Sequence, residues 1–352
     1  MVIAVSASII VEKNVMVSMP DGVALATDIY RPSTEAVLPV LLQRTPYDKD
    51  FSTIPDILRM AGAGYCVVVQ DTRGCFASEG VFTPFINEAA DGAACMDWAA
   101  TQPWSNGRIG SFGASYVGAT QWLAATRAHP ALCGMAPLVT ASDYYEGWTY
   151  QGGAFELGFT LHRTLGFALS DTLRRVGRGT AMPDERERVL DAIGAIDLLY
   201  KQLPLTSMPL LTPCAPYYAD WLRHPENDGS WQRISPSRSY EQIGVPALNM
   251  GGWYDIFANG TLANYSGMKA RGGTAHARSR QRLIMGPWAH GVDGDAFPWQ
   301  SFGPRAGTRA VTVDLVGAHL RWFDYVLKDI DDGIRLEAPV RIFVMGTNRW
   351  RE

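Results

Sequence analysis

The stretch GRIGSFGASYVGATQWLAA, residues 107–125, constrains the fold more than any other part of the chain. Its first half is a strand-like apolar run, its second half has a helical pattern, and Ser115 stands at the junction. A tight strand-to-helix turn strains its central residue, and small neighbours such as Gly113 and Gly118 let adjacent elements approach. The turn would present the serine hydroxyl at a helix N-terminus, where backbone N–H groups and the helix dipole favour developing negative charge.

Two other interpretations of this stretch compete with a nucleophile elbow. The spacing is G-x-S-x-x-G, so the motif alone supports an elbow and an ordinary glycine-rich turn about equally. Gly107, Gly110 and Gly113 are spaced three apart, but this is not the dinucleotide-binding fingerprint, and the first glycine precedes the apolar run. A Rossmann interpretation is therefore weak.

Short apolar runs on both sides of this turn alternate with helical patterns. LPVLLQR (38–44) and GYCVVVQD (64–71) are typical of strands buried in parallel sheets, and 87–102 has a helical pattern. The alternation returns with VPALNMGGWYD (245–255) and RLIMGPWAH (282–290). This order predicts an α/β fold with a mostly parallel central sheet.

The alternation stops between residues 142 and 240. This segment has helix-like stretches with many prolines and aromatic residues, but no convincing parallel strands. We therefore predict a helical cap at 142–240, inserted into a discontinuous core formed by residues 1–141 and 241–352.

Composition excludes several classes of partner. Charged residues make up 19% of the chain and the net charge is −4, which provides no electrostatic footprint for nucleic acid or an anionic membrane. The five cysteines are scattered without a C-x-x-C pair, so neither a disulfide framework nor a zinc site is indicated. The apolar stretch in residues 1–17 has no basic flank and is too short to span a bilayer. We expect a reduced, cytoplasmic protein.

A serine hydroxyl needs a base to take its proton, and the base needs an orienting carboxylate. Asp255 ends one late apolar run and His290 ends the next, in the chain order typical of α/β-hydrolases. Because both follow strands, we expect both to reach the sheet edge at which Ser115 lies. The other histidines are assigned structural positions: His129, His162, His224, His276 and His319.

Two donors are expected to stabilise the oxyanion of the tetrahedral intermediate. One is the backbone N–H of Tyr116, the residue after the nucleophile. The other normally comes from the loop after the third strand, where Pro46 has no N–H but the phenol of Tyr47 could donate. Position alone leaves open whether Tyr47 donates or merely packs.

Five motifs, RTPYDK, QDTRGCFASEG, WSNGRIGSFGASYVGATQW, GGWYDIF and GPWAH, occur in this order along the chain. Together they resemble the CocE/NonD hydrolases, a group related to the X-prolyl dipeptidyl-peptidases. The resemblance implies an α/β-hydrolase fold, Ser115 as nucleophile, His290 as base and Asp255 as its carboxylate. It also implies Tyr47 and Tyr116 as oxyanion donors, a helical cap after the sixth strand, and no metal or organic cofactor. Asp71 and Arg73 are interpreted as structural.

The chain departs from that family in two respects. The family continues into a β-rich jelly-roll domain, whereas this chain stops at Glu352 after a segment, 338–352, that resembles the first strand of that domain. We expect either a fragment or a truncation, and an uncovered face that favours association into a homo-oligomer. In addition, Asp255 is followed by Ile256, Phe257 and Ala258, without the carboxylates that related enzymes use to bind an ammonium group.

We therefore expect a serine hydrolase acting on small-molecule carboxylic esters or amides. Three aromatic residues are candidates for lining the substrate pocket: Trp148, Trp253 and Phe257. The sequence leaves open whether each lines the pocket or simply packs in the core. One alternative is an X-prolyl peptidase or acylase, in which Glu146 or Asp143 would anchor the substrate N-terminus. Another is a poorly active binding or scaffold module that retains the elbow.

Overall fold

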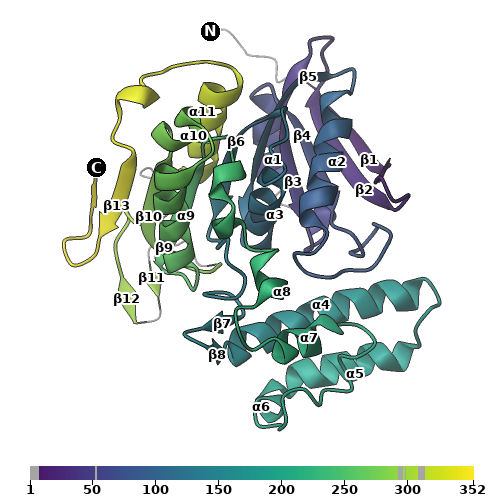
Figure 1. The fold of residues 1–352 in the computed structure, drawn as a ribbon. Helices are drawn as coiled ribbons and strands as arrows, with labels where there is room; N and C mark the ends of the chain where they lie inside the picture. The colour runs from purple at the N-terminus through teal and green to yellow at the C-terminus, as the bar shows by residue number, and fades with distance from the viewer. Residues whose placement is uncertain (1–7, 52–53, 292–295, 298, 308–313) are drawn as a thin grey trace.

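The computed structural model describes residues 8–51, 54–291, 296–297, 299–307 and 314–352. The strands of its central sheet are β1 (Ile9–Ser18), β2 (Ala24–Pro32), β3 (Leu38–Thr45), β4 (Cys66–Asp71), β5 (Ser105–Ala114), β6 (Leu132–Leu138), β9 (Leu248–Tyr254), β10 (Arg282–Ala289), β13 (Val340–Val344) and β14 (Arg349–Arg351). Within the described ranges they lie in the order β1-β2-β4-β3-β5-β6-β9-β10-β13-β14 (Figure 1). All neighbours from β4 to β13 are parallel, whereas β1, β2 and β14 pair antiparallel at the two edges. The predicted α/β fold with a mostly parallel sheet is confirmed.

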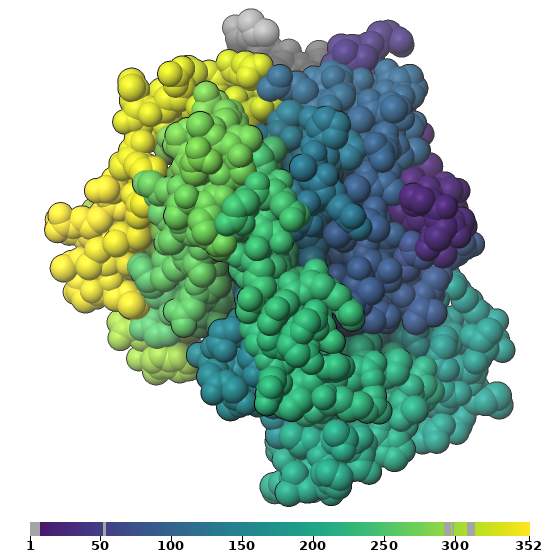
Figure 2. All heavy atoms as spheres, in the orientation of Figure 1, coloured from purple at the N-terminus to yellow at the C-terminus, as the bar shows by residue number. Residues whose placement is uncertain are grey.

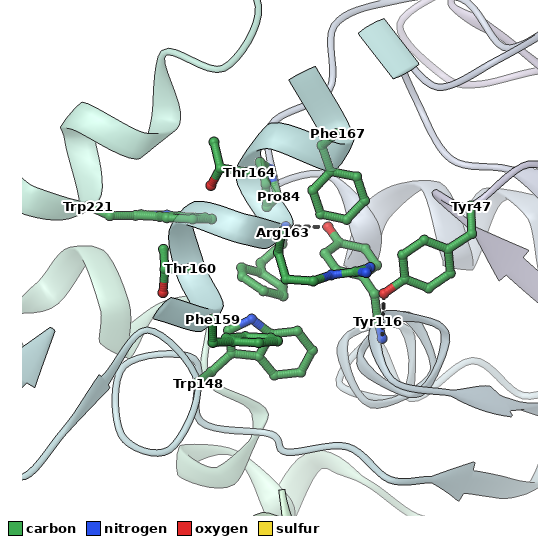
Figure 3. A pocket seen from close by; sticks show the side chains of 11 residues that line it. Tyr47, Pro84, Tyr116, Trp148, Phe159, Thr160, Arg163, Thr164, Phe167 and Trp221 are labelled. Atoms are coloured by element: carbon green, nitrogen blue, oxygen red, sulfur yellow. Dashed lines mark hydrogen bonds between the residues drawn. The ribbon is translucent and has the colours of Figure 1, made fainter. Parts of the chain in front are cut away.

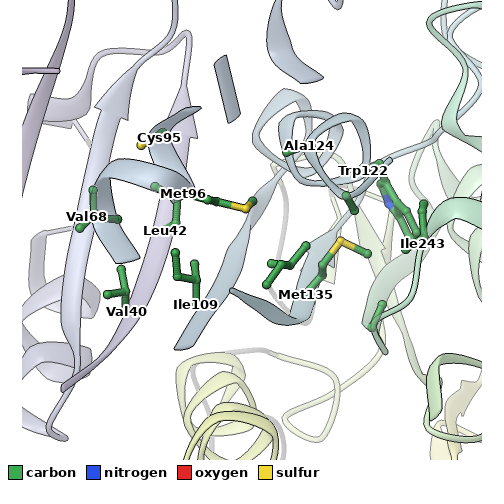
Figure 4. Close-up of a cluster of buried hydrophobic side chains, with 14 of the residues drawn as sticks. Val40, Leu42, Val68, Cys95, Met96, Ile109, Trp122, Ala124, Met135 and Ile243 are labelled. Carbon is green, nitrogen blue, oxygen red and sulfur yellow. The ribbon is translucent and has the colours of Figure 1, made fainter. Parts of the chain in front are cut away.

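Helices cover both faces of this sheet. On one face lie α2 (Glu88–Ala100), α3 (Tyr116–Ala125), α9 (Ala258–Arg271) and α10 (Ala275–Ser279), and on the other α1 (Ile54–Gly62) and α11 (Leu315–Leu327). Successive residues of a strand point to opposite faces, so a strand covered on both sides must be apolar throughout. In β3, Val40 and Leu42 belong to the apolar cluster on the face covered by α2 and α3 (Figure 4). Leu41 belongs to the apolar cluster on the face covered by α1 and α11. This double burial explains the continuous apolar runs in the sequence.

Between β6 and β9 the chain forms a separate helical layer. Its elements are the hairpin β7 (Tyr150–Gln151) and β8 (Ala154–Phe155), the α-helices α4 (Leu157–Gly177), α5 (Pro183–Gly194), α6 (Ile196–Leu199), α7 (Tyr217–Arg223) and α8 (Gly229–Gln232), and the 3₁₀ turns η2 (Pro236–Arg238) and η3 (Tyr240–Gln242). Helices α4 to α7 lie together at one end of the core, below the sheet in Figure 1, and Figure 2 shows this layer packed against that end. The layer has an apolar cluster of its own, which includes Leu161, Leu165 and Val189. We call residues 142–240 the cap from here on.

The end of the chain lies in the central sheet. The segment 338–352 resembles in sequence the first strand of the family's β-rich domain, and in this structure β13 pairs in parallel with β10 and thereby extends the central sheet. The reason is apolar packing, because Val340 and Ile342 pack against the cluster that contains Leu283 and Met285 of β10. The remaining short elements are η1 (Lys49–Phe51), η4 (Ile334–Leu336) and the hairpin β11 (Ala296–Phe297) with β12 (Gln300–Ser301).

The described residues form neither a disulfide nor a metal-binding cluster. All five cysteines are free thiols. No cluster of three or more His, Cys, Asp or Glu side chains suited to a metal ion occurs in the described part of the chain. Among the helices described, none combines the length and apolarity needed to cross a membrane.

Candidate active site

Ser115 lies at the sharp turn between β5 and α3. Its φ of 60° and ψ of −125° place a non-glycine residue in a rarely populated region, as expected of a strained elbow. The flanking glycines are required sterically. A Cβ added to Gly113, whose φ is +131°, would lie 2.3 Å from Val117 Cγ1, and one added to Gly118 would lie 2.4 Å from Thr140 Cγ2. The glycine-rich sequence is therefore explained by an elbow closely packed against its surroundings.

The structure brings Ser115, His290 and Asp255 into one chain of hydrogen bonds. His290 Nε2 lies 2.9 Å from Ser115 Oγ, and His290 Nδ1 lies 2.8 Å from Asp255 Oδ2. The three residues follow the carboxyl ends of β5, β9 and β10, which meet at one edge of the sheet because these strands are parallel. The Asp255 side chain is 0% exposed and that of His290 30% exposed.

The second oxygen of the Asp255 carboxylate has a partner of its own. Asp255 Oδ1 accepts a hydrogen bond of 2.6 Å from the backbone N–H of Phe257. With both carboxylate oxygens engaged, Asp255 holds the imidazole in the tautomer whose Nδ1–H donates to it. Nε2 then faces Ser115 with its lone pair, which is the arrangement that a general base requires.

Tyr47 and the backbone of Tyr116 converge beside the Ser115 hydroxyl. Tyr47 Oη lies 3.4 Å from Ser115 Oγ, and the Tyr116 N–H donates to Tyr47 Oη at 3.4 Å. Tyr47 is positioned by the end of β3, where its own N–H donates to Thr45 Oγ1 at 3.0 Å. The Tyr47 hydroxyl and the Tyr116 N–H therefore lie together beside the Ser115 hydroxyl, as the sequence analysis expected of them.

The side chain of Tyr116 is anchored by a buried polar network that sequence reasoning missed. Its hydroxyl accepts from the Phe85 N–H at 2.7 Å and donates to Glu88 Oε1 at 3.2 Å. Arg44 Nη1 in turn donates to Glu88 Oε2 at 2.8 Å, with both side chains almost fully buried. Burial raises the pKa of the Tyr116 phenol well above its usual value, so this hydroxyl stays protonated. Arg44 begins the RTPYDK motif, but nothing in the sequence identified Glu88 as its partner.

An aromatic pocket lies between the cap and the elbow. Its side chains include Tyr47, Phe85 and Tyr116 from the core and Phe159, Arg163 and Phe167 from α4 (Figure 3). The free space is about 20 Å³, enough to hold about one water molecule. The α4 residues were not predicted, because which face of a cap helix turns inward depends on tertiary packing.

The three predicted pocket aromatics have different positions. Trp148 lines the aromatic pocket. The Phe257 ring stacks on the Trp148 ring with 4.3 Å between their centres, and it meets the His290 ring edge-on with 5.3 Å between centres. Trp253 does not reach this pocket. Its Nε1–H donates to the Phe343 carbonyl at 2.8 Å, and it packs in the cluster beside β13. Of the two alternatives that the sequence left open for Trp253, this structure shows packing, beside β13.

The two carboxylates proposed as ammonium anchors stabilise local turns instead. Asp143 Oδ1 accepts from the backbone N–H groups of Tyr145 at 3.1 Å and Glu146 at 3.0 Å. Glu146 Oε1 accepts from the Gly152 N–H at 3.1 Å. Neither residue is among those that line the aromatic pocket.

Other polar residues singled out in the sequence lie in structural positions. Asp71 accepts from the N–H groups of Lys49 and Ala77, and Arg73 pairs with Asp91 at 2.7 Å. The contacts of three histidines are His129 with Asp97 at 2.9 Å, His224 with Asp228 at 2.6 Å and His319 with the Leu315 carbonyl at 2.7 Å. The side chains of His162 and His276 are exposed.

Comparison with known proteins gives consistent matches. Residues 21–292 match the family model described as X-Pro dipeptidyl-peptidase (S15 family). The chain is 36% identical to cocaine esterase of Rhodococcus sp. (strain MB1 Bresler) over 357 residues, which cover 97% of this chain and 59% of that protein.

Solved structures share the fold. An aminopeptidase from a marine sediment archaeon, Thaumarchaeota archaeon, superposes with a TM-score of 0.69 at 21% identity, covering 98% of this chain and 58% of its own. A CocE/NonD family hydrolase from Staphylococcus aureus superposes with a TM-score of 0.66 at 22% identity, covering 95% and 53%. The chain thus spans less than two thirds of the length of these relatives.

Proposed function

The chain belongs to the X-Pro dipeptidyl-peptidase (S15) family, and from this premise we propose that it is a serine hydrolase that cleaves carboxylic esters through an acyl-enzyme. Its family membership and its similarity to cocaine esterase confirm the resemblance to CocE/NonD hydrolases that the ordered motifs indicated. The observation that most supports the proposal is the continuous hydrogen-bond chain from Ser115 through His290 to Asp255.

Acylation begins when His290 Nε2 takes the proton of Ser115 Oγ as that oxygen bonds to the ester carbonyl carbon. The carbonyl oxygen becomes an oxyanion, which the Tyr47 hydroxyl and the Tyr116 N–H stabilise by donating to it. Asp255 stabilises the imidazolium without taking its proton. The intermediate then collapses, the bond to the alcohol oxygen breaks, and His290 protonates the departing alcohol.

Deacylation repeats these steps with water as the nucleophile. His290 takes a proton from water while the water oxygen bonds to the acyl carbon. The second tetrahedral intermediate expels Ser115 Oγ, which regains a proton from His290. The carboxylic acid leaves, and the enzyme returns to its starting state without any other reactant.

Ester cleavage is favoured over X-prolyl peptidase activity by the positions of the local carboxylates. A peptidase of that kind needs an acidic group facing the substrate N-terminus. Asp143 and Glu146 instead accept hydrogen bonds from backbone N–H groups of their own loop. The described residues that line the aromatic pocket include no carboxylate.

A fluorophosphonate probe and two substrates test the proposal. Intact-mass analysis should show one probe adduct on the wild type and no adduct on Ser115→Ala. A suitable control is Ser170→Ala, since Ser170 lies on α4 and its hydroxyl donates only to the Gly166 carbonyl. The wild type should hydrolyse a p-nitrophenyl acyl ester faster than an X-Pro anilide. Absence of labelling in folded wild-type protein would favour an inactive scaffold, and preference for the anilide would favour the peptidase.

A further inference from the structure

Arg163 is a charged residue of the aromatic pocket to which the proposed mechanism gives no role. It projects from α4 toward Tyr47 (Figure 3), and its guanidinium carbon lies 4.9 Å from the centre of the Tyr47 ring. The same carbon lies 5.3 Å from the centre of the Phe167 ring. The two rings are nearly parallel, 5.9 Å apart. The cation therefore contacts two aromatic walls of the pocket.

The guanidinium lacks a carboxylate partner in the described part of the chain. No described residue forms an ion pair with Arg163 or accepts a hydrogen bond from it. By contrast, Arg174 and Arg175 on the same helix both pair with Asp171, at 2.7 and 2.8 Å. Contact with aromatic rings satisfies the flat face of a guanidinium but leaves its N–H donors at the rim available. A half-buried cation of this kind is suited to an anionic ligand.

The surroundings of Arg163 select the type of ligand. The rest of the lining is aromatic apart from Pro84 and two threonines of α4, Thr160 and Thr164, which add hydroxyl groups. A substrate ammonium would meet a positive charge there without a carboxylate to balance it. A carboxylate would instead match the planar, forked donors of arginine and form two parallel hydrogen bonds.

The position of Arg163 relates this charge to the reacting atoms. The Tyr47 ring that it covers has its hydroxyl 3.4 Å from Ser115 Oγ. An anion bound to Arg163 would consequently lie about one aromatic ring away from the bond to be cleaved. We propose that Arg163 is a specificity-determining residue that binds a carboxylate carried by the ester substrate, on either its acyl or its alcohol side. This inference rests on the proposed function.

Two substrate pairs distinguish the two sides. For the acyl side, phenyl hydrogen adipate is compared with the phenyl ester of adipamic acid, in which a neutral amide replaces the carboxylate. For the alcohol side, 4-(butyryloxy)benzoate is compared with 4-(butyryloxy)benzamide. Release of the phenol gives kcat/KM for each ester, and the quantity of interest is the anionic-to-neutral ratio within each pair.

The variants are Arg163→Gln and a matched control, Arg186→Gln. Arg186 lies on α5, pairs with Glu187 and is outside the pocket, so its replacement makes the same change of charge within the cap. We expect Arg163→Gln to lower the ratio about 10- to 100-fold in at least one pair, as for the loss of hydrogen bonds to a charged group. Arg186→Gln should leave the ratio unchanged. Arg163→Lys, which keeps the charge without the fork, should give an intermediate ratio.

A ratio that Arg163→Gln leaves unchanged in both pairs overturns the inference. An equal fall for the anionic and neutral esters also overturns it, because Arg163 would then act through Tyr47 on every ester. Circular dichroism of each variant shows that the fold is retained. Should Arg163→Gln fail to fold, the ratio in Arg163→Lys decides by the same criteria.

Binding separates this inference from the proposed function. Calorimetry with Ser115→Ala measures the affinity for both members of each pair without turnover. If the wild type cleaves no ester, the proposed function fails. The Arg163 site is still supported if Ser115→Ala binds the anionic ester more tightly than the neutral one and the double variant Ser115→Ala/Arg163→Gln does not. Equal affinities for the anionic and neutral esters overturn it.

Discussion

Replacing Tyr47 by phenylalanine removes a single oxygen atom beside the proposed nucleophile. The ring keeps its stacking on Phe167 and its contact with Arg163, because neither interaction uses the hydroxyl. The loss is therefore confined to the two contacts of Tyr47 Oη, with Ser115 Oγ and with the Tyr116 N–H, each 3.4 Å long. The variant isolates the donor role of the phenol from its role in packing.

The expected magnitude follows from the number of donors that remain. With the phenol gone, the oxyanion keeps the Tyr116 N–H as its donor from this pair. Loss of one oxyanion donor costs about 100- to 1,000-fold in kcat, equivalent to about 2.7 to 4 kcal/mol of transition-state stabilisation. KM should change much less, since the donor acts on charge that develops only in the transition state.

The assay is steady-state hydrolysis of p-nitrophenyl butyrate by the wild type, Tyr47→Phe and a control, Tyr145→Phe. The Tyr145 hydroxyl donates to the Pro225 carbonyl at 2.7 Å within the cap, so the control removes a comparable hydroxyl away from Ser115. We expect kcat to fall only in Tyr47→Phe. If kcat is unaffected there while Ser115→Ala is inactive, the phenol is a packing residue and the oxyanion argument is wrong.

Three further variants test other parts of the structure. Asp255→Asn should lower kcat by about 10,000-fold by changing the imidazole tautomer, and a loss below tenfold would contradict the orienting role. Gly118→Ala should reduce the free energy of unfolding, measured in urea, by about 1 to 3 kcal/mol, because the new Cβ would lie 2.4 Å from buried Thr140. Gly166→Ala is the control, since a Cβ there meets open space and should cause no such loss. Equal urea midpoints for the two variants would refute this prediction. Burial raises the pKa of Asp71 to about 7, so the folded protein holds a proton that the unfolded chain releases near pH 4. The contribution of this carboxyl to the free energy of unfolding should therefore fall as pH rises from about 4 to 7. Urea titrations of Asp71→Asn across this pH range should lack that decrease.

The positions of Ser115, Asp255 and His290 could be predicted because each follows a strand of a parallel sheet. The carboxyl ends of such strands share one edge, so chain order and strand recognition were enough to bring the three residues together. The same argument placed Tyr47 at this edge after β3. Whether its phenol contacted Ser115 could not be predicted, since a side-chain direction in a loop is set by neighbours such as Phe167.

The remaining parts of the site depend on contacts between distant segments. The sequence left open whether Trp253 lines the pocket or packs, because the answer depends on the pairing of β13 with β10, which provides the carbonyl to which the indole donates. Arg163 was not identified because a lone arginine in a helical pattern normally faces solvent. Glu88 was missed for a similar reason, since a carboxylate is buried only where a partner such as Arg44 compensates its charge.

The chain leaves the core after β6 and returns to it at β9, and these two strands are neighbours that pair at Leu138 and Met250. The two ends of the cap also lie close together, since the Ser142 and Tyr240 hydroxyls are 2.9 Å apart and the Ser237 N–H donates to the Ser142 carbonyl at 3.0 Å. An insertion joined in this way can be lengthened, shortened or exchanged without altering the register of the sheet. Evolution could therefore remodel the cover of the pocket while the residues at the strand ends keep their positions, and a laboratory could graft another cap at the same two junctions.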